Sequence, residues 1–288
     1  MGSVEKAELV AVSSVEHQVN HEGLDSLFLF ERLHNPTIRK QIINLSCEAD
    51  QTLSGQTIEV PRRQENGDFV YDENWHPLFE EKPYVPQTPE EMEEQFDKTL
   101  LQIERETLVS FDKEDHVGPY VHPAMFREIM PLDWIYPLTG KKATQKMMSI
   151  CEAHEKGHVI RRHYVYNPYL MDKFQKAFDQ GNVTFTEQDY KYMIAGLPQK
   201  EPPPPFEDAR EIFFQYIFSA HEIAERMSQL KSYFSIKDDA PFTKEHLTYA
   251  REHYIEDTGL DNQMTPFFQA ITPGKEAAFL ELINSAGI

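Results

Sequence analysis

The sequence predicts a mainly helical protein of the α+β class, with a small β-hairpin in its first half. Apolar residues recur at helical spacing in several long segments, whose ends carry prolines, glycines and helix-capping residues. Two short segments rich in β-forming residues flank an Asn-Gly pair, which is typical of a tight hairpin turn. Apolar residues make up 40% of the 288-residue chain, enough to bury a core.

In the first half, residues 24–45 carry apolar side chains that predict two helices, broken near Asn35-Pro36 because proline cannot continue a helix. Residues 57–60 and 68–71 are expected to pair as the hairpin, around a turn at Glu65-Asn66-Gly67. The following stretch, from Pro77 to Pro89, has the prolines of a connector.

A capping box is predicted at Thr88 and Glu91, at the start of a helix whose apolar residues continue to Ile103. Residues 72–115 hold 14 acidic and 4 basic side chains, which is half of the excess negative charge of the chain. The simplest interpretation is a solvated helix face, and the alternative is an inhibitory or partner-binding segment. We expect residues 1–115 to form an acidic N-terminal region of helices and a hairpin.

Residues 116–288 are expected to form one helix-rich unit. Prolines, glycines and capping residues mark the ends of its predicted helices. These helices are expected near residues 141–164, 168–180, 187–195, 209–234, 244–256 and 275–284.

The overall charge limits the classes of partner. The chain has 28 basic and 48 acidic residues, a net charge of −20, which disfavours nucleic acid and anionic membrane surfaces as partners. No apolar run approaches the ~20 residues of a membrane span. The N-terminus has no apolar signal core, and two cysteines, Cys47 and Cys151, predict no disulfide framework. We therefore expect a cytoplasmic protein without membrane or nucleic-acid partners.

The most informative motif is His154-Glu155-Lys156-Gly157-His158. Two histidines four residues apart on a helix lie one turn above each other, so both can bind one metal ion. Glu155 lies one position further round, where its carboxylate can take a proton from water at the metal. Gly157 removes side-chain bulk beside the pair, which allows another segment or a substrate to approach.

A third ligand is predicted on the helix expected at residues 209–234. This helix is apolar around much of its circumference and is therefore expected to be buried. It nevertheless contains His221, Glu222 and Glu225, and a buried carboxylate needs a charge partner such as a metal. Glu222 is the first choice, with Glu225 and His221 as alternates. These residues could instead lie on an exposed strip and pair with Arg226 or Arg210.

The His-Glu-x-x-His motif and the downstream Glu222-Ile-Ala-Glu225 segment resemble the zincin metallopeptidases, most closely the gluzincin branch. The resemblance covers roughly residues 140–235. It implies one Zn²⁺ bound by His154, His158 and Glu222, with Glu155 as catalytic acid/base, and hydrolysis of a peptide or protein substrate. The sequence departs from the thermolysin-like pattern around the later glutamate, which leaves Glu222 and Glu225 both open.

Other polar residues could assist the reaction or complete the site. Cys151 lies one turn before His154 and is either a thiolate ligand or a buried inert thiol. Possible hydrogen-bond donors to a substrate carbonyl, each more often a packing residue, are Tyr249, His253, Tyr254, His122, Tyr164 and Tyr166.

Two other functions fit the same residues less well. One is a di-iron carboxylate bundle, which normally has two Glu-x-x-His motifs, whereas one convincing copy is present here. The other is a binding or regulatory module without activity, in which the metal is structural or absent. A fourth protein ligand, such as His221 or Cys151, would favour a structural site.

Overall fold

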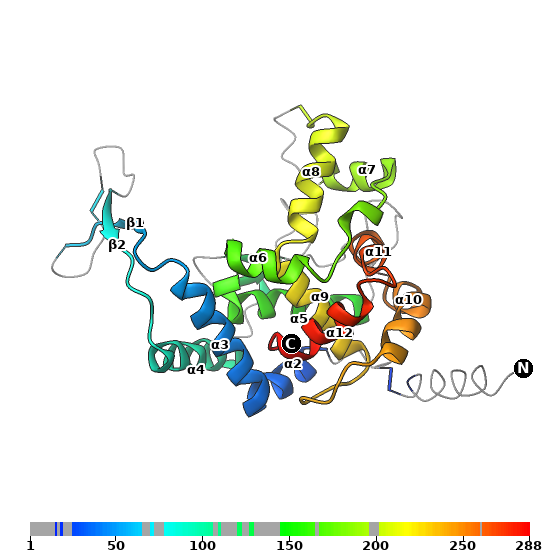
Figure 1. Ribbon diagram of the computed structural model, residues 1–288, viewed down its shortest axis with the longest axis horizontal. Coiled ribbons are helices and arrows are strands. Elements are labelled where there is room, and N and C mark those ends of the chain that lie inside the picture. Colours follow the sequence, from blue (N-terminus) through cyan, green and yellow to red (C-terminus); the bar gives the residue numbers. More distant parts are fainter. Residues whose placement is uncertain are drawn as a thin grey trace, which may run out of the picture.

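The computed structural model describes Val15, Gln18 and Val19, and residues 25–64, 70–71, 78–105, 109–110, 120–122, 127–129, 145–164, 167–195, 202–259 and 261–288. Over these residues the chain is mainly helical with small β-sheets, which confirms the predicted class at that level (Figure 1). Its helices are α2 (Asp25–His34), α3 (Pro36–Gln51), α4 (Pro89–Arg105), α5 (Gln145–Ile160), α6 (Pro168–Gln175), α7 (Glu187–Ala195), α8 (Phe206–Ile217), α9 (Ala220–Tyr233), α10 (Lys244–Thr258), α11 (Asp261–Ala270) and α12 (Glu276–Ser285), with 3₁₀ turns η1 (Arg162–Tyr164) and η2 (Gln180–Asn182). Its strands are β1 (Thr57–Pro61), β2 (Phe79–Pro83), β3 (Val109–Ser110), β4 (Tyr120–His122) and β5 (Arg127–Ile129).

The first two described helices are separated where the sequence predicts. α2 ends at His34, and α3 begins at Pro36. Asn35 caps α3, because its side-chain oxygen accepts hydrogen bonds from the backbone N–H groups of Thr37 and Ile38. The predicted capping box of α4 is also present: the Thr88 N–H donates to the Glu91 carboxylate, and the Glu91 N–H donates to the Thr88 hydroxyl.

The hairpin differs from the prediction in its second strand. β1 pairs antiparallel with β2, so the assignment of residues 68–71 as its partner is wrong. Val70 lies at the end of this ladder, where its N–H donates to the Arg62 carbonyl and its carbonyl accepts from Leu78. β2 is largely exposed and charged, so it lacks the apolar alternation by which a strand is recognised. The predicted turn at residues 65–67 lies outside the described residues.

The helix predicted at residues 209–234 is two helices, α8 and α9, separated at Phe218 and Ser219. Ser219 has an extended backbone, and its carbonyl accepts the first hydrogen bond of α9, from the Ile223 N–H at 2.9 Å. Each of the two helices buries one face, so apolar residues continue through the break. The apolar pattern of the sequence therefore does not reveal where α8 ends and α9 begins. The break places Glu222 in the first turn of α9.

The remaining helices follow the predictions, except that α6 ends at Gln175 rather than near residue 180 and that one helix, α11, is additional. The segment predicted at residues 141–164 is helical from Gln145 to Ile160 and continues as η1, while residues 141–144 lie outside the described part. α11 was not predicted, because it contains Pro266, which removes a backbone donor from the helix interior.

α9 lies at the centre of the helical body, and in Figure 1 α5 lies beside it while α8 and the β1–β2 hairpin project outward. Every residue of α9 except His221 is buried. Helices α2, α3 and α4 of the predicted N-terminal region share an apolar cluster with α5 of the predicted helix-rich unit. The two predicted parts are therefore in contact, and their division at residue 115 stays a prediction.

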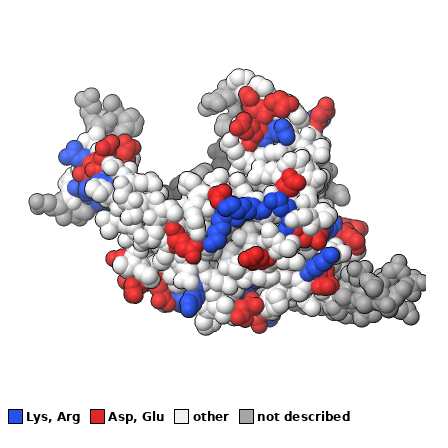
Figure 2. All heavy atoms as spheres, viewed as in Figure 1, with Lys and Arg blue, Asp and Glu red and all other residues white. Residues whose placement is uncertain are grey.

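Charges of both signs are interspersed on the face shown in Figure 2. Acidic side chains flank the row of basic side chains across its middle. Ion pairs of this kind include Lys173 with Glu48, at 3.1 Å, and Lys176 with Asp172, at 2.5 Å. Since these pairs are exposed, each contributes at most about 1 kcal/mol to stability.

Candidate metal centre

The two motif histidines lie one turn apart on α5, as predicted. The ring centroids of His154 and His158 are 4.6 Å apart, and the rings are nearly perpendicular. Their side chains are 7% and 17% exposed, so the pair is almost excluded from solvent. Both rings direct Nε2 toward α9, where one carboxylate lies between them.

That carboxylate belongs to Glu222. Its Oε2 lies 3.3 Å from His154 Nε2, and its Oε1 lies 3.4 Å from His158 Nε2. One ligand atom from each of the three residues lies within 4.8 Å of the others, and Glu222 is only 4% exposed. Its position in the first turn of α9 also favours a negative charge, because the free N–H groups of a helix start carry a partial positive charge.

Glu225, the first alternate, lies outside this group. Both of its carboxylate oxygens accept from Arg161 Nη1 at 2.9 Å, and both side chains are fully buried. The Glu225 carboxylate also lies against Gly157, where a Cβ atom would come within 1.7 Å of its Oε2. The bulk that Gly157 removes is therefore replaced by a carboxylate from α9.

His221, the second alternate, is adjacent to the group without belonging to it. Its Nε2 lies 4.0 Å from Glu222 Oε1, and its ring centroid lies 5.2 Å from that of His158. Burial is the main cause that lowers the pKa of His221, to about 4, with the neighbouring histidines adding to the effect. The neutral ring stands at the edge of the site with 15% of its side chain exposed.

Arg226 balances the charge of Glu222 from one turn further along α9. Its Nη1 lies 2.5 Å from Glu222 Oε2, and its side chain is 1% exposed. The predicted alternative is therefore confirmed in its pairing of Glu222 with Arg226 and wrong in its exposed position, because both side chains are buried. Arg210 instead lies 3.9 Å from Glu207.

These contacts set the protonation of the site. Burial by itself would raise the pKa of Glu222, but Arg226 and the two histidines hold it well below its usual range. Burial acts to lower the pKa of His158, yet its hydrogen bond to Glu222 and the surrounding carboxylates raise it to about 9. The contact thus favours the charged form of each group, a carboxylate at Glu222 and an imidazolium at His158.

The three residues fit a zinc ion in chemistry and spacing. Imidazole nitrogen and carboxylate oxygen are ordinary zinc ligands, and tetrahedral bonds of about 2.0–2.1 Å place neighbouring ligand atoms roughly 3.3–3.4 Å apart. The two His–Glu222 separations are near this value, but each histidine faces a different oxygen of the carboxylate. Among the residues that the structure describes, none forms a hydrogen bond with the buried Nδ1 atoms of His154 and His158.

Glu155, the predicted general base, lies close enough to the group to interact with it electrostatically. Burial raises the pKa of its carboxyl group. His154 and His158 act in the opposite direction, whereas Glu222 and Glu225 add to the increase. A carboxyl group with a raised pKa is better suited to exchange protons near neutral pH.

The candidate substrate-contacting residues of α10 are not brought to the centre. Tyr254 packs against Tyr233 at 4.9 Å between ring centroids, and Tyr249 packs against Phe234 and His253. Tyr233 follows Glu222 by eleven positions on α9, about 16 Å along the helix axis. These residues therefore pack at the other end of α9.

Of the remaining candidates, the two whose side chains the structure describes, Tyr164 and Cys151, do not belong to the three-residue group. Tyr164 is buried and donates to the Ala286 carbonyl at 3.0 Å, and Cys151 is half-buried one turn before the histidines. His122 lies in β4, and Tyr166 lies outside the described residues. Sequence reasoning missed Arg161, although a buried glutamate implies a basic partner.

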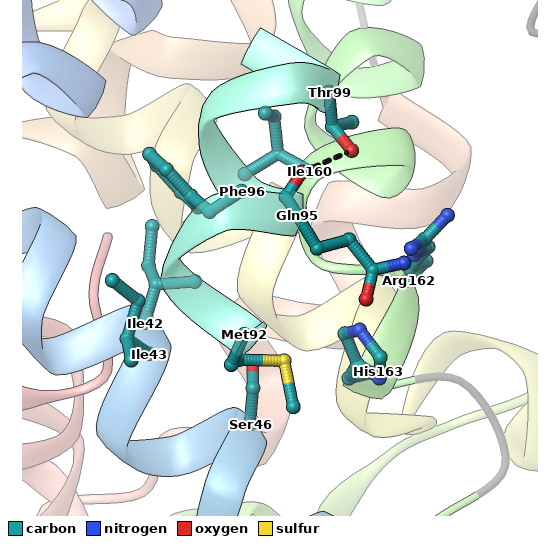
Figure 3. A pocket seen from close by; sticks show the side chains of 10 residues that line it. All are labelled: Ile42, Ile43, Ser46, Met92, Gln95, Phe96, Thr99, Ile160, Arg162 and His163. Atoms are coloured by element: carbon teal, nitrogen blue, oxygen red, sulfur yellow. Dashed lines mark hydrogen bonds between the residues drawn. The ribbon is translucent and has the colours of Figure 1, made fainter. Parts of the chain in front are cut away.

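A separate hollow lies between α3, α4 and the end of α5 (Figure 3). Its empty volume is about 260 Å³ including the open mouth, and its floor is apolar. Gln95, Arg162 and His163 supply polar atoms to the lining, and the buried Oε1 atom of Gln95 has no hydrogen-bond partner among the described residues. None of the three metal-centre residues lines this hollow.

Within the described part of the chain, every helix is too short or too polar to cross a bilayer. Comparisons of the chain with protein-family models, with curated proteins and with solved structures give no match.

Proposed function

We propose that this protein is a zinc-dependent peptidase that acts on a peptide or protein substrate. His154, His158 and Glu222 are the proposed metal ligands, and Glu155 is the proposed general base. The observation that carries the proposal is the buried group of two imidazoles and one carboxylate, drawn from two helices, whose ligand atoms lie within 4.8 Å of one another. The same residues carry the resemblance to the gluzincins.

The chemistry divides between the ion and the chain. When bound, zinc supplies Lewis acidity that polarises a carbonyl and favours ionisation of water. Glu155 accepts the proton lost by the attacking water and passes it to the leaving amine. Arg226 holds the Glu222 carboxylate in place, so that this side chain keeps one orientation toward the histidines.

The first test is the metal content of the purified protein, with and without His158→Ala. One equivalent of zinc in the wild type, and its loss in the variant, is the expected result. Absence of any transition metal after expression and reconstitution with zinc would remove the basis of the proposal.

The second test separates metal binding from catalysis. Glu155→Gln should keep one zinc and lose hydrolysis of a peptide library, because the amide cannot accept the proton of water. Glu152→Gln is the matched control, since Glu152 lies on the same helix and pairs with Lys156 instead. Wild-type turnover by Glu155→Gln would exclude Glu155 as the base.

A structural metal site is the second candidate, and the burial of the group favours it. A structural site needs a fourth protein ligand, and His221 is near enough to supply one after a small movement. Cobalt substitution distinguishes the two candidates: a change of the visible spectrum on adding azide indicates an exchangeable position. A di-iron centre is less favoured because Glu225 is bound by Arg161.

We propose the cytoplasm as the place of action. Neither Cys47 nor Cys151 forms a disulfide, which suits a reducing compartment.

A further inference from the structure

A fully buried ion pair joins the two ligand-bearing helices next to the metal centre. Arg161 follows the last turn of α5, and Glu225 lies on α9; both side chains have no exposed surface. Glu225 is three residues after Glu222 and therefore shares its side of α9. The contact thus lies within one helical turn of a proposed ligand.

The glycine in the motif allows this contact. The Glu225 carboxylate occupies the space where a Cβ of residue 157 would lie, at 1.7 Å from Oε2. Gly157 immediately precedes His158, so the carboxylate rests on the backbone that carries this ligand. The distance between α5 and α9 at the site is consequently set by a carboxylate packed directly on a helix backbone.

The last residues of the chain hold the guanidinium in place. Nε and Nη2 of Arg161 donate to the Gly287 carbonyl at 3.1 and 2.8 Å, while Nη1 donates to Glu225. Gly287 has a φ of +70°, and a Cβ there would lie 2.4 Å from a side-chain carbon of Ile42. The same segment is bound by Tyr164, through the Ala286 carbonyl. Arg161 therefore has one orientation available.

We propose that Arg161 is a positioning residue of the metal centre. It binds no metal; it holds Glu225 against Gly157 and so keeps Glu222 at the correct distance from the two histidines, and the Gly287 carbonyl fixes Arg161 in turn. The inference rests on the proposed metal site. It assigns Gly157 a specific partner, the Glu225 carboxylate, and it makes the segment around Gly287 part of the support of the metal centre.

The test compares metal affinity with stability in two matched pairs of variants. Arg161→Met is paired with Arg162→Met, because the Arg162 side chain lines the hollow of Figure 3 instead. Gly157→Ala is paired with Gly274→Ala, since a Cβ at Gly274 meets nothing within 4 Å. Zinc affinity is measured by competition with a chromophoric chelator, and the fold and stability of the zinc-free protein by circular dichroism in urea.

Both test variants are expected to bind zinc about 10- to 100-fold more weakly, the usual effect of losing a group that orients metal ligands. Both controls are expected to keep wild-type affinity. The cobalt spectrum of the test variants should keep the wild-type ligand set, because no ligand has been removed.

Three outcomes decide the proposal. If the wild type binds no zinc, the proposed function fails and the positioning role fails with it. If the wild type binds zinc and both test variants are less stable but bind it equally well, Arg161 has only a structural role and the metal site stands. Arg161→Met leaves the buried Glu225 carboxylate without its charge partner. If this variant does not fold, the zinc affinity of Gly157→Ala alone decides the proposal.

Discussion

Zinc binding to this protein should be strongly pH-dependent and should release a proton at neutral pH. The cause is His158, whose Nε2 lies 3.4 Å from Glu222 Oε1. Burial opposes protonation of this imidazole, but the hydrogen bond to Glu222 and the nearby carboxylates raise its pKa to about 9 from the ordinary 6.5. Zinc binds the neutral ring, so the proton must leave.

The size of the effect follows from the distance between pH and pKa. At pH 7 the pKa of His158 lies about two units above the pH. Displacing the bound proton therefore lowers the apparent zinc affinity roughly 100-fold, or by about 3 kcal/mol. Apparent zinc affinity should rise about tenfold per pH unit from pH 7 to pH 9, and this contribution should level off above the pKa of His158. With an ordinary pKa of 6.5, His158 would contribute little over this range.

Isothermal titration calorimetry in two buffers of different ionisation enthalpy counts the protons released on zinc binding. We expect about one proton from His158 at pH 7 and fewer at pH 9.5, with His163→Ala as a control that leaves the count unchanged. His163 suits this purpose because burial lowers its pKa, and it lies in the separate hollow. A pH-independent affinity between pH 7 and 9 would refute the reasoning about the His158–Glu222 contact.

Two further predictions concern stability. Burial, together with Arg32 and Arg161, lowers the pKa of Lys231 to about 7 from 10.5, so between these values the unfolded state binds more protons and stability rises with pH. Relative to Lys231→Met, the wild type should gain about 1 kcal/mol per pH unit from pH 7 to 10 in urea unfolding, and parallel curves would contradict this. Asn167 caps α6 and also donates to a buried backbone carbonyl at 3.0 Å, so Asn167→Ala should cost about 2 kcal/mol, against about 1 for Asn35→Ala, which loses a cap alone. If Asn167→Ala and Asn35→Ala lower the urea midpoint and the free energy of unfolding equally, the hydrogen bond from Asn167 to the backbone carbonyl contributes nothing.

The parts of the site that sequence reasoning predicted are those set by local geometry. The pairing of His154 with His158 needs only a helix, since side chains four residues apart always lie on one side of it. The buried state of Glu222 followed from the apolar residues around it. The same reasoning failed for β2, because an exposed strand is determined by its backbone partner and carries no apolar signal.

The choice among Glu222, Glu225 and His221 illustrates what local pattern leaves open. All three lie within one turn of α9, and an apolar helix pattern treats them alike. The choice depends on the break at Ser219, which starts α9 just before Glu222, and on the approach of α5 from one side. Arg161 then binds Glu225 and leaves Glu222 between the histidines.

By itself, the sequence determined the helical class, the capping box of α4 and the facing pair of imidazoles, because each depends on contacts within a few residues along the chain. Only the tertiary structure decided which carboxylate meets that pair, and which residues hold it there. The physical reason is that these contacts join segments up to 126 residues apart, as in the bond from Arg161 to Gly287, and their partners are chosen by packing.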